Sequence, residues 1–165
     1  ADLNGNGTPE IIHKTDTYLN VYQFKDNNFE SLDGWPQRLN FQAGFSGGGK
    51  SQPVVGDVDG DNKPDIIVYF IKDKEFNLLA YNAVGELLDG FPKAINELEE
   101  KGIYPTPAIA DIDNNGTNEI IVAGRSNNFS PIVYAFELNK KKHGNILWGQ
   151  FAKNAKHSNF VPLSN

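Results

Sequence analysis

Cysteine is absent from this sequence, so disulfides give no indication of the redox compartment in which the protein works. No apolar run approaches the ~18 residues of a membrane-spanning helix, and we therefore expect no membrane span. Basic residues are in the minority, with 15 Lys and Arg against 21 Asp and Glu, and the net charge of −6 disfavours a nucleic-acid partner. No signal peptide is visible at Ala1, but the chain opens inside a motif and is expected to be a fragment, which leaves secretion open.

Turn-forming residues are plentiful. The 165 residues suffice for one domain with a hydrophobic core, and they include 16 glycines, 9 prolines and many Asn and Asp residues. This composition predicts a β-dominated chain in which short strands alternate with turns.

The sequence contains an internal repeat. Three acidic segments align without gaps, DLNGNGTPEII from Asp2, DVDGDNKPDII from Asp57 and DIDNNGTNEII from Asp111, at spacings of 55 and 54 residues. A second marker keeps the same phase, as GWPQRL from Gly34 and GFPKAI from Gly90, with a weaker copy, ILWGQF, further on. Because two independent markers hold one register, the sequence predicts three structural repeats.

Each repeat is predicted to hold strands around its acidic loop. The predicted strands are short, apolar and rich in β-branched and aromatic residues: Tyr18–Phe24, Val54-Val55, Ile66–Phe70, Phe76–Tyr81, Ile120–Val122 and Pro131–Phe136. Ala94–Lys101 has a helical composition and is expected to form at most a turn or two of helix.

About 50 residues holding four short strands is the size of one propeller blade. We therefore predict an all-β fold of three propeller-like blades of about 54 residues, forming one partial β-propeller over residues 1–165. The repeats fall approximately at 1–51, 52–105 and 106–165, and the first is expected to lack its opening strand because the chain starts at the loop.

The stretch Gly44–Ser51, GFSGGGKS, has the letters of a phosphate-binding loop. Such a loop works only where it leads into a helix whose N-terminal amides face the phosphates. Here Pro53 and the predicted strand Val54-Val55 follow at once, so no helix can begin there. We interpret the stretch as a loop between repeats and not as a nucleotide site.

The acidic loops predict metal binding. Oxygen-bearing side chains occupy loop positions 1, 3, 5 and 9, and alternate positions in a tight loop can direct their oxygens at one centre, as Ca²⁺ requires. The backbone carbonyl at position 7 is a further predicted ligand. Up to three Ca²⁺ sites are predicted: Asp57, Asp59, Asp61, Asp65 and the Lys63 carbonyl; Asp111, Asp113, Asn115, Glu119 and the Thr117 carbonyl; Asp2, Asn4, Asn6, Glu10 and the Thr8 carbonyl.

Two alternatives compete with this interpretation. An EF-hand needs a bidentate Glu at position 12, where these loops hold His13, Val68 and Val122, and its flanks would be helices. Asp, Asn and Gly clusters also form turns without any metal. However, four carboxylates within nine residues of the second loop would repel one another unless a cation compensated them, which favours metal.

The pattern D-x-D-x-D-G-x-x-D followed by an apolar strand resembles the FG-GAP/VCBS calcium-binding repeat, which builds the β-propeller of integrin α chains and of many secreted bacterial proteins. The segment Asp57–Asp65 matches the pattern fully, and the outer loops depart from it at Asn4, Asn6 and Asn115. The GWP and GFP markers are also similar to those of secreted bacterial members, and the segment from Trp148 to Ser158 resembles a segment that often ends such arrays. The resemblance implies that calcium stabilises the turn between the first two strands of each blade.

Enzymatic chemistry finds no support in the residues, and we predict no catalytic residues. His13, His143 and His157 are expected on loops or strand ends, and no nucleophile elbow accompanies His157-Ser158. The loop carboxylates are committed to metal, and the two arginines, Arg38 and Arg125, are expected to pack or to form ion pairs.

The leading functional hypothesis is a calcium-stabilised, non-catalytic segment of an extracellular, cell-surface or periplasmic protein, used for adhesion or recognition of a protein or glycan ligand. Alternatives are a carbohydrate-binding propeller that stacks sugars on Trp35, Phe91 or Trp148, and the propeller portion of a polysaccharide-active enzyme. Three blades are too few to close a ring, so self-association that completes the propeller is also expected. The tail His157–Asn165 is predicted to pair as a strand, with Ser158–Val161 in the place of Ser51–Val54.

Overall fold

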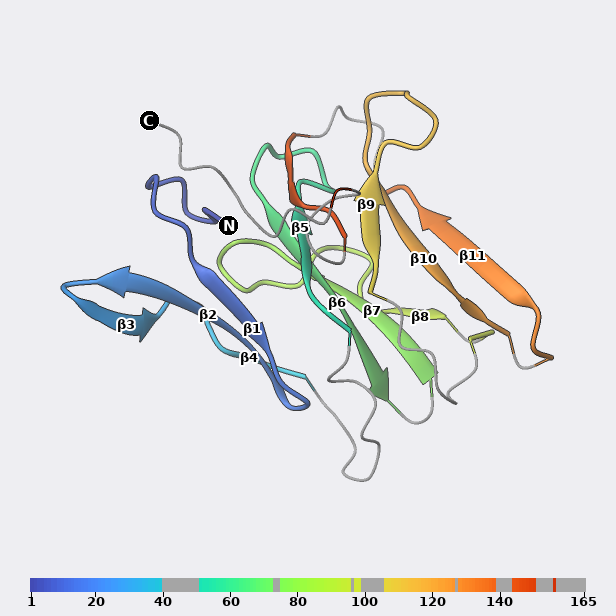
Figure 1. Ribbon diagram of the computed structural model, residues 1–165, viewed down its shortest axis with the longest axis horizontal. Helices are drawn as coiled ribbons and strands as arrows, with labels where there is room; N and C mark the ends of the chain where they lie inside the picture. Colours follow the sequence, from blue (N-terminus) through green and yellow to red (C-terminus); the bar gives the residue numbers. More distant parts are fainter. Residues whose placement is uncertain are drawn as a thin grey trace.

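The computed structural model describes residues 1–39, 51–72, 75–95, 97–98, 106–126, 128–138, 144–150 and 156. Within these ranges the chain forms twelve strands and no helix, and the strands assemble into three antiparallel sheets (Figure 1). No closed barrel forms among the described strands. The all-β prediction is therefore confirmed.

The first sheet is built around one long strand. β2 pairs with β1 along one edge, and β3 and β4 share its other edge. The bounds are β1 Ile11–Lys14, β2 Tyr18–Lys25, β3 Asn28–Ser31 and β4 Gln37–Arg38.

The second sheet is a meander of four strands with a fifth added from far along the chain. Its order is β12-β5-β6-β7-β8, with bounds β5 Val54–Gly56, β6 Asp65–Lys72, β7 Glu75–Tyr81, β8 Lys93–Ile95 and β12 Ile146–Trp148. The third sheet has the order β11-β10-β9, with bounds β9 Ala108–Ala110, β10 Glu119–Arg125 and β11 Pro131–Phe136.

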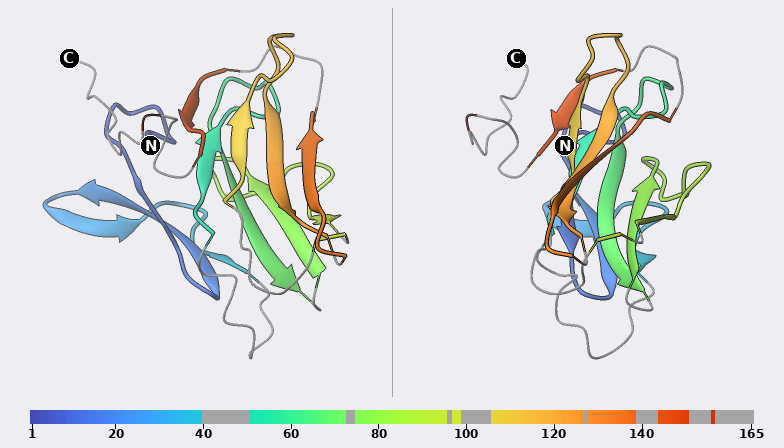
Figure 2. Two further views of the ribbon diagram at one scale, coloured as in Figure 1. Left: turned by 45° about the vertical axis from the view of Figure 1, so that its right-hand side comes forward. Right: turned by 90° about the vertical axis from the view of Figure 1, so that its right-hand side faces the viewer.

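The three sheets stack face to face in sequence order, as the left view of Figure 2 shows. Side chains of the central strand β6 alternate between two cores because successive residues of a strand point to opposite faces. Ile67 and Tyr69 join the core shared with the third sheet, whereas Ile66 and Val68 join the core shared with the first. The second sheet is therefore covered on both faces, which explains its nearly continuous apolar sequence.

The GWP and GFP markers pack each sheet against the next. Trp35 lies in the core between the first and second sheets, where its Nε1–H donates to the Ala83 carbonyl at 3.1 Å. Phe91 lies in the core between the second and third sheets. Gly34, with φ of 85°, has the Val84 carbonyl oxygen only 2.0 Å from where a Cβ would stand. Only glycine permits this close approach of one repeat to its neighbour.

The structure confirms the predicted strands and corrects one element. All six predicted strands form, as β2, β5, β6, β7, β10 and β11. The helical expectation for Ala94–Lys101 is wrong at its start, where Ala94 and Ile95 extend β8 and pair with β7, because burial of Ile95 in the core outweighs local propensity.

Some predictions concern residues that the structure does not describe. Gly44–Lys50 and His157–Asn165 lie outside the described residues, and so does most of the segment that follows Ala94–Ile95. The division into repeats at 1–51, 52–105 and 106–165 stays a prediction.

Candidate metal-binding loops

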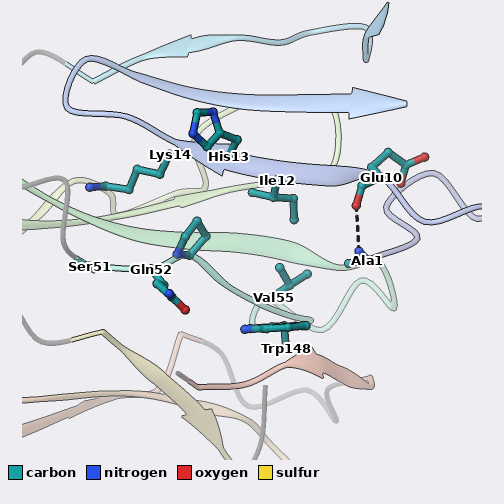
Figure 3. A pocket seen from close by; sticks show the side chains of 10 residues that line it. Ala1, Glu10, Ile12, His13, Lys14, Ser51, Gln52, Val55 and Trp148 are labelled. Atoms are coloured by element: carbon teal, nitrogen blue, oxygen red, sulfur yellow. Dashed lines mark hydrogen bonds between the residues drawn. The ribbon is translucent and has the colours of Figure 1, made fainter. Parts of the chain in front are cut away.

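The three acidic loops occupy equivalent places in the three sheets. The second connects β5 to β6 and the third connects β9 to β10, and across their necks Gly56 pairs with Asp65 and Ala110 with Glu119. The first loop precedes β1 and is closed in the same way. The Glu10 N–H donates to the Ala1 carbonyl at 2.8 Å, and the Ala1 amine donates to the Glu10 carbonyl at 3.1 Å (Figure 3).

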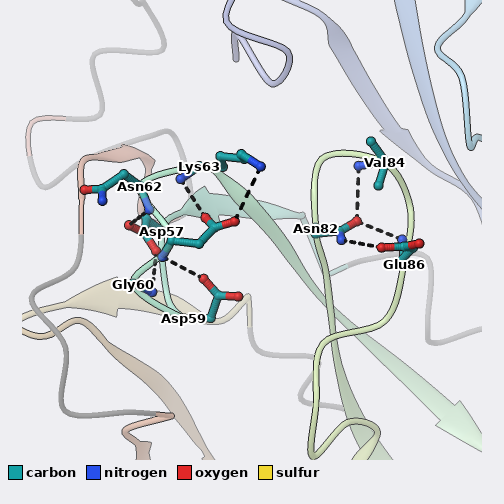
Figure 4. A network of polar contacts seen from close by, with 9 residues as sticks. Asp57, Asp59, Gly60, Asn62, Lys63, Asn82, Val84 and Glu86 are labelled. Atoms are coloured by element: carbon teal, nitrogen blue, oxygen red, sulfur yellow. Dashed lines mark hydrogen bonds and ion pairs between the residues drawn. The ribbon is translucent and has the colours of Figure 1, made fainter.

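Backbone amides hold the carboxylates of the second loop in place (Figure 4). Asp57 accepts from the amides of Gly60 at 2.7 Å and Asn62 at 2.9 Å. The carboxylate at position 3 accepts from the amide at position 5, and the one at position 5 from the amide at position 7, at 3.0 and 2.7 Å. At the end of the loop, Asp65 reaches back to the Val58 N–H at 2.9 Å. The loop backbone therefore folds around its own acidic side chains.

The other two loops repeat this arrangement. Asp2 accepts from the Gly5, Asn6 and Gly7 amides, and Asp111 accepts from the Asn115 and Gly116 amides, at 2.9–3.2 Å. The position-9 carboxylates again bond the position-2 amides, Glu10 to Leu3 at 2.7 Å and Glu119 to Ile112 at 2.8 Å. Three sequences that differ at several acidic positions thus adopt one geometry.

Two of the loops gather carboxylate oxygens closely enough to hold a metal ion. One oxygen from each of Asp57, Asp59 and Asp61 lies within 4.8 Å of the others, and the same holds for Asp111, Asp113 and Glu119. Such a cluster of hard oxygen donors fits Ca²⁺ or Mg²⁺ better than softer metals. The inner members Asp57 and Glu119 are buried, whereas Asp61 and Asp113 are exposed, so solvent reaches one side of each cluster.

The Asp65 carboxyl is buried at the end of the second loop. Burial raises its pKa to about 7, the Val58 N–H bond opposes the rise, and the carboxylates of Asp59, Asp57 and Asp61 add to it. Lys63 gives little compensation, because its Nζ lies 3.9 Å from Asp61 Oδ2 in an exposed pair. Four carboxylates therefore lie close together in this loop, which favours the binding of a cation.

The first loop carries less charge. Asn4 and Asn6 replace two acidic positions, and the Asn4 Nδ2 donates to Glu10 Oε1 at 2.8 Å. This hydrogen bond stabilises the Glu10 carboxylate with a neutral donor in place of a cation. Only Asp2 and Glu10 contribute carboxylates here, so the structure supports a cation less strongly in this loop than in the other two.

Thr117, whose carbonyl is a predicted ligand, also contacts neighbouring carboxylates through its side chain. It is buried, and its hydroxyl lies within hydrogen-bond distance of two carboxylates, Glu119 Oε1 at 3.3 Å and Glu137 Oε1, just after β11, at 3.0 Å. Its carbonyl, like those of Lys63 and Thr8, stays a predicted ligand. Glu137 was not identified from the sequence, since no repeat marker surrounds it.

Distant residues also contact the second loop, and the repeats gave no sign of them. The Gly144 N–H donates to Asp57 Oδ2 at 2.7 Å, which joins residues 87 positions apart. The buried Asn118 donates through Nδ2 to the carbonyls of Asp57 at 2.8 Å and Gly144 at 3.2 Å. Asn118 occupies loop position 8, where the other loops have Pro9 and Pro64, and this departure was the only available signal.

The remaining candidates from the sequence lie away from the loops. His13 is exposed on β1, and Arg125 lies over the Phe129 ring at 4.6 Å. Arg38 is exposed in β4, and His143 and His157 lie outside the described residues.

In the ranges that the structure describes, no helix is long and apolar enough to cross a membrane.

Comparison with known families gives one match. Residues 2–68 match the sequence model of the FG-GAP-like repeat. This segment begins with the first acidic loop and runs through the second into β6, so the resemblance inferred from the loop residues is confirmed over it. Comparison with curated proteins and with solved structures finds no match.

Proposed function

We propose that this chain is a calcium-stabilised, non-catalytic recognition or adhesion module of an extracellular protein, built from three propeller-like blades. Residues 2–68 carry an FG-GAP-like repeat, and such repeats are associated with extracellular β-repeat domains. The face-to-face stacking of the three sheets, with an acidic loop directly before β1, β6 and β10, supports the blade interpretation.

One observation carries the calcium proposal: all three loops share one hydrogen-bonding pattern, and two of them converge three carboxylate oxygens within 4.8 Å. A turn that needed no metal would not require this convergence, because like charges at such distances destabilise the folded chain. The cation would bind Asp57, Asp59, Asp61 and Asp65 in the second loop and Asp111, Asp113, Asn115 and Glu119 in the third. Its chemistry there is structural, since it neutralises the loops and fixes the connection between two strands.

Calcium binding is tested by calorimetric titration and by thermal unfolding in EDTA and in millimolar Ca²⁺. If Ca²⁺ binds only the folded state, saturation at 100 Kd adds about 2.7 kcal/mol per site. Asp57→Ala should remove most of the contribution of the second loop. Asp89→Ala, which removes an exposed carboxylate outside the loops, is the matched control and should leave the calcium response intact. A melting temperature that does not respond to Ca²⁺ would refute the proposal.

Recognition is tested separately, because metal binding does not identify a ligand. A glycan array probed with the calcium-loaded protein distinguishes a carbohydrate-binding propeller from a protein-binding one. Two of the three aromatic candidates for sugar stacking are unsuited, since Trp35 and Phe91 are 7% and 9% exposed and lie in the cores. Trp148 is half-buried and stays the one aromatic of the three with an accessible face. Activity on uronic-acid polymers would instead favour the enzyme alternative.

A further inference from the structure

A single buried side chain connects the second and third acidic loops. Asn118 is 6% exposed and lies at position 8 of the third loop, between Thr117 and Glu119, which are both predicted to bind the cation of that loop. Its Nδ2 donates to the carbonyl of Asp57, the first residue of the second loop, at 2.8 Å. One amide therefore joins the third candidate metal site to the second.

The same amide also holds a second residue that supports Asp57. Asn118 Nδ2, which has two protons, donates as well to the Gly144 carbonyl at 3.2 Å, and the Gly144 N–H donates to Asp57 Oδ2 at 2.7 Å. Gly144 shortly precedes β12, which pairs with β5 immediately before Asp57 (Figure 1). Asn118 therefore fixes Asp57 both directly and through Gly144.

Both oxygens of the Asp57 carboxylate are held in place. Oδ1 accepts from the Gly60 amide at 2.7 Å, and Oδ2 accepts from the Asn62 amide at 2.9 Å (Figure 4), in addition to the bond from Gly144. Asp57 is 1% exposed, so these bonds lie where water does not readily replace them. The direction of this carboxylate within the second loop therefore depends on Gly144 and, through it, on Asn118.

The second loop offers the first loop no such amide. Its residue at position 8 is Pro64, whose side chain has no donor, and a cleft of about 320 Å³ lies between the two loops. Asp2 and Asn4 line this cleft from the first loop, and Asn62 and Pro64 line it from the second. The first and second loops therefore provide a comparison within the same chain for the pair that Asn118 joins.

We propose that Asn118 couples cation binding at the second and third loops, so that its amide makes a cation in one loop favour a cation in the other. This coupling rests on the calcium sites of the proposed function. A cation bound by the Thr117 carbonyl and Glu119 fixes the backbone on both sides of Asn118, which in turn holds Asp57 in place for the second site. The loop that binds later then loses less conformational freedom, which gives positive coupling.

Charge alone acts in the opposite sense, because two cations repel each other. Asn118 is neutral, so its replacement leaves this repulsion unchanged. The contribution of the amide is therefore the difference between the coupling measured with Asn118 and the coupling measured without it. A hydrogen bond of ordinary net strength corresponds to about fivefold in affinity, and linkage requires the same factor in both directions.

Titration of the isotope-labelled protein with Ca²⁺, followed by nuclear magnetic resonance, measures each loop separately. The Gly7, Gly60 and Gly116 amides donate to the first carboxylate of the first, second and third loops. Their resonances should shift when that carboxylate binds a cation. Each amide therefore reports the Kd of its own site.

The coupling is measured as the change in the Kd read at Gly116 when the second site is weakened. Asp59→Asn with Asp61→Asn weakens it and introduces the asparagines that the first loop carries at positions 3 and 5. We expect this change to raise the Kd at Gly116 about fivefold more in the chain with Asn118 than in the chain with Asn118→Ala. Asn118→Pro is a second variant without the amide, and proline already occupies this position in the other two loops.

The outcomes separate the coupling from calcium binding itself. An equal or smaller change at Gly116 with Asn118 than without it would overturn the coupling and leave the calcium sites in place. The absence of any calcium response at Gly60 and Gly116 would overturn the proposed function and the coupling with it. Gly7 is the control, since replacement of Asn118 should not alter how the first site responds to the weakened second site.

Discussion

Substitution of Asp65 by asparagine should stabilise the calcium-free protein at neutral and alkaline pH. Asp65 is buried, and its pKa is raised from 3.8 to about 7 by burial and by the neighbouring carboxylates. The folded state therefore binds a proton on this group more tightly than the unfolded state does. Between pH 4 and 7, the contribution of Asp65 to stability falls as the pH rises, and above pH 7 its full cost is present.

The size of the effect follows from the difference between the two pKa values. Each pKa unit corresponds to about 1.4 kcal/mol, so a shift of this size sets an upper value of about 4 kcal/mol above pH 7. Relaxation and water entry reduce this, and we expect a gain of about 1–3 kcal/mol for Asp65→Asn at pH 8 in EDTA. Asparagine keeps an oxygen that accepts the Val58 N–H bond, so this stabilising contact is preserved.

Urea unfolding in EDTA at pH 5, 6.5 and 8 measures the difference between Asp65→Asn and the unsubstituted protein. The difference should be small at pH 5 and largest at pH 8. In saturating Ca²⁺ the order should reverse, because the cation favours the charged carboxylate that the variant lacks. Asp89→Asn, at an exposed position outside the loops, should show neither trend. An Asp65→Asn variant that is less stable than the unsubstituted protein in EDTA at pH 8 would refute the reasoning.

Three further predictions concern packing, and each is checked by the midpoint of denaturant unfolding. Gly34→Ala should lower the free energy of unfolding by more than about 2 kcal/mol, because the new Cβ would meet the Val84 carbonyl oxygen. Gly7→Ala has the same φ of 85° but no atom within 4 Å of its Cβ, and it should lower the free energy of unfolding by only about 1 kcal/mol. Equal losses in the two variants would contradict this. Ile67→Ala removes a fully buried side chain between the second and third sheets and should cost about 2–5 kcal/mol. Asn118→Ala removes the hydrogen bonds that its Nδ2 donates to the Asp57 and Gly144 carbonyls, and it should lower the free energy of unfolding by about 1–3 kcal/mol. Stabilisation by calcium should also be weaker, and unchanged stabilisation would mean that this contact does not support the second loop.

Local features of the fold could be read from the sequence because they depend on residues close together in the chain. The apolar β-branched runs Ile66–Phe70 and Pro131–Phe136 form β6 and β11. Two of the loops bring three carboxylates together, and in the second these belong to Asp57, Asp59 and Asp61, which lie within one nine-residue segment. Helical composition misled at Ala94 and Ile95, where pairing with β7 and burial of Ile95 decide the conformation.

Contacts between distant segments were decided only by the tertiary structure. The marker around Trp148 was identified as a weak repeat, yet Ile146–Trp148 joins the second sheet beside β5, and Gly144 donates to Asp57 across 87 positions. The residues near each segment do not determine these partners, because the edge of a strand can pair with any backbone that packing places beside it. The sequence by itself determined the six predicted strands and the acidic side chains that the loops carry. The tertiary structure decided that the middle sheet is covered on both faces, because burial depends on the packing of whole sheets.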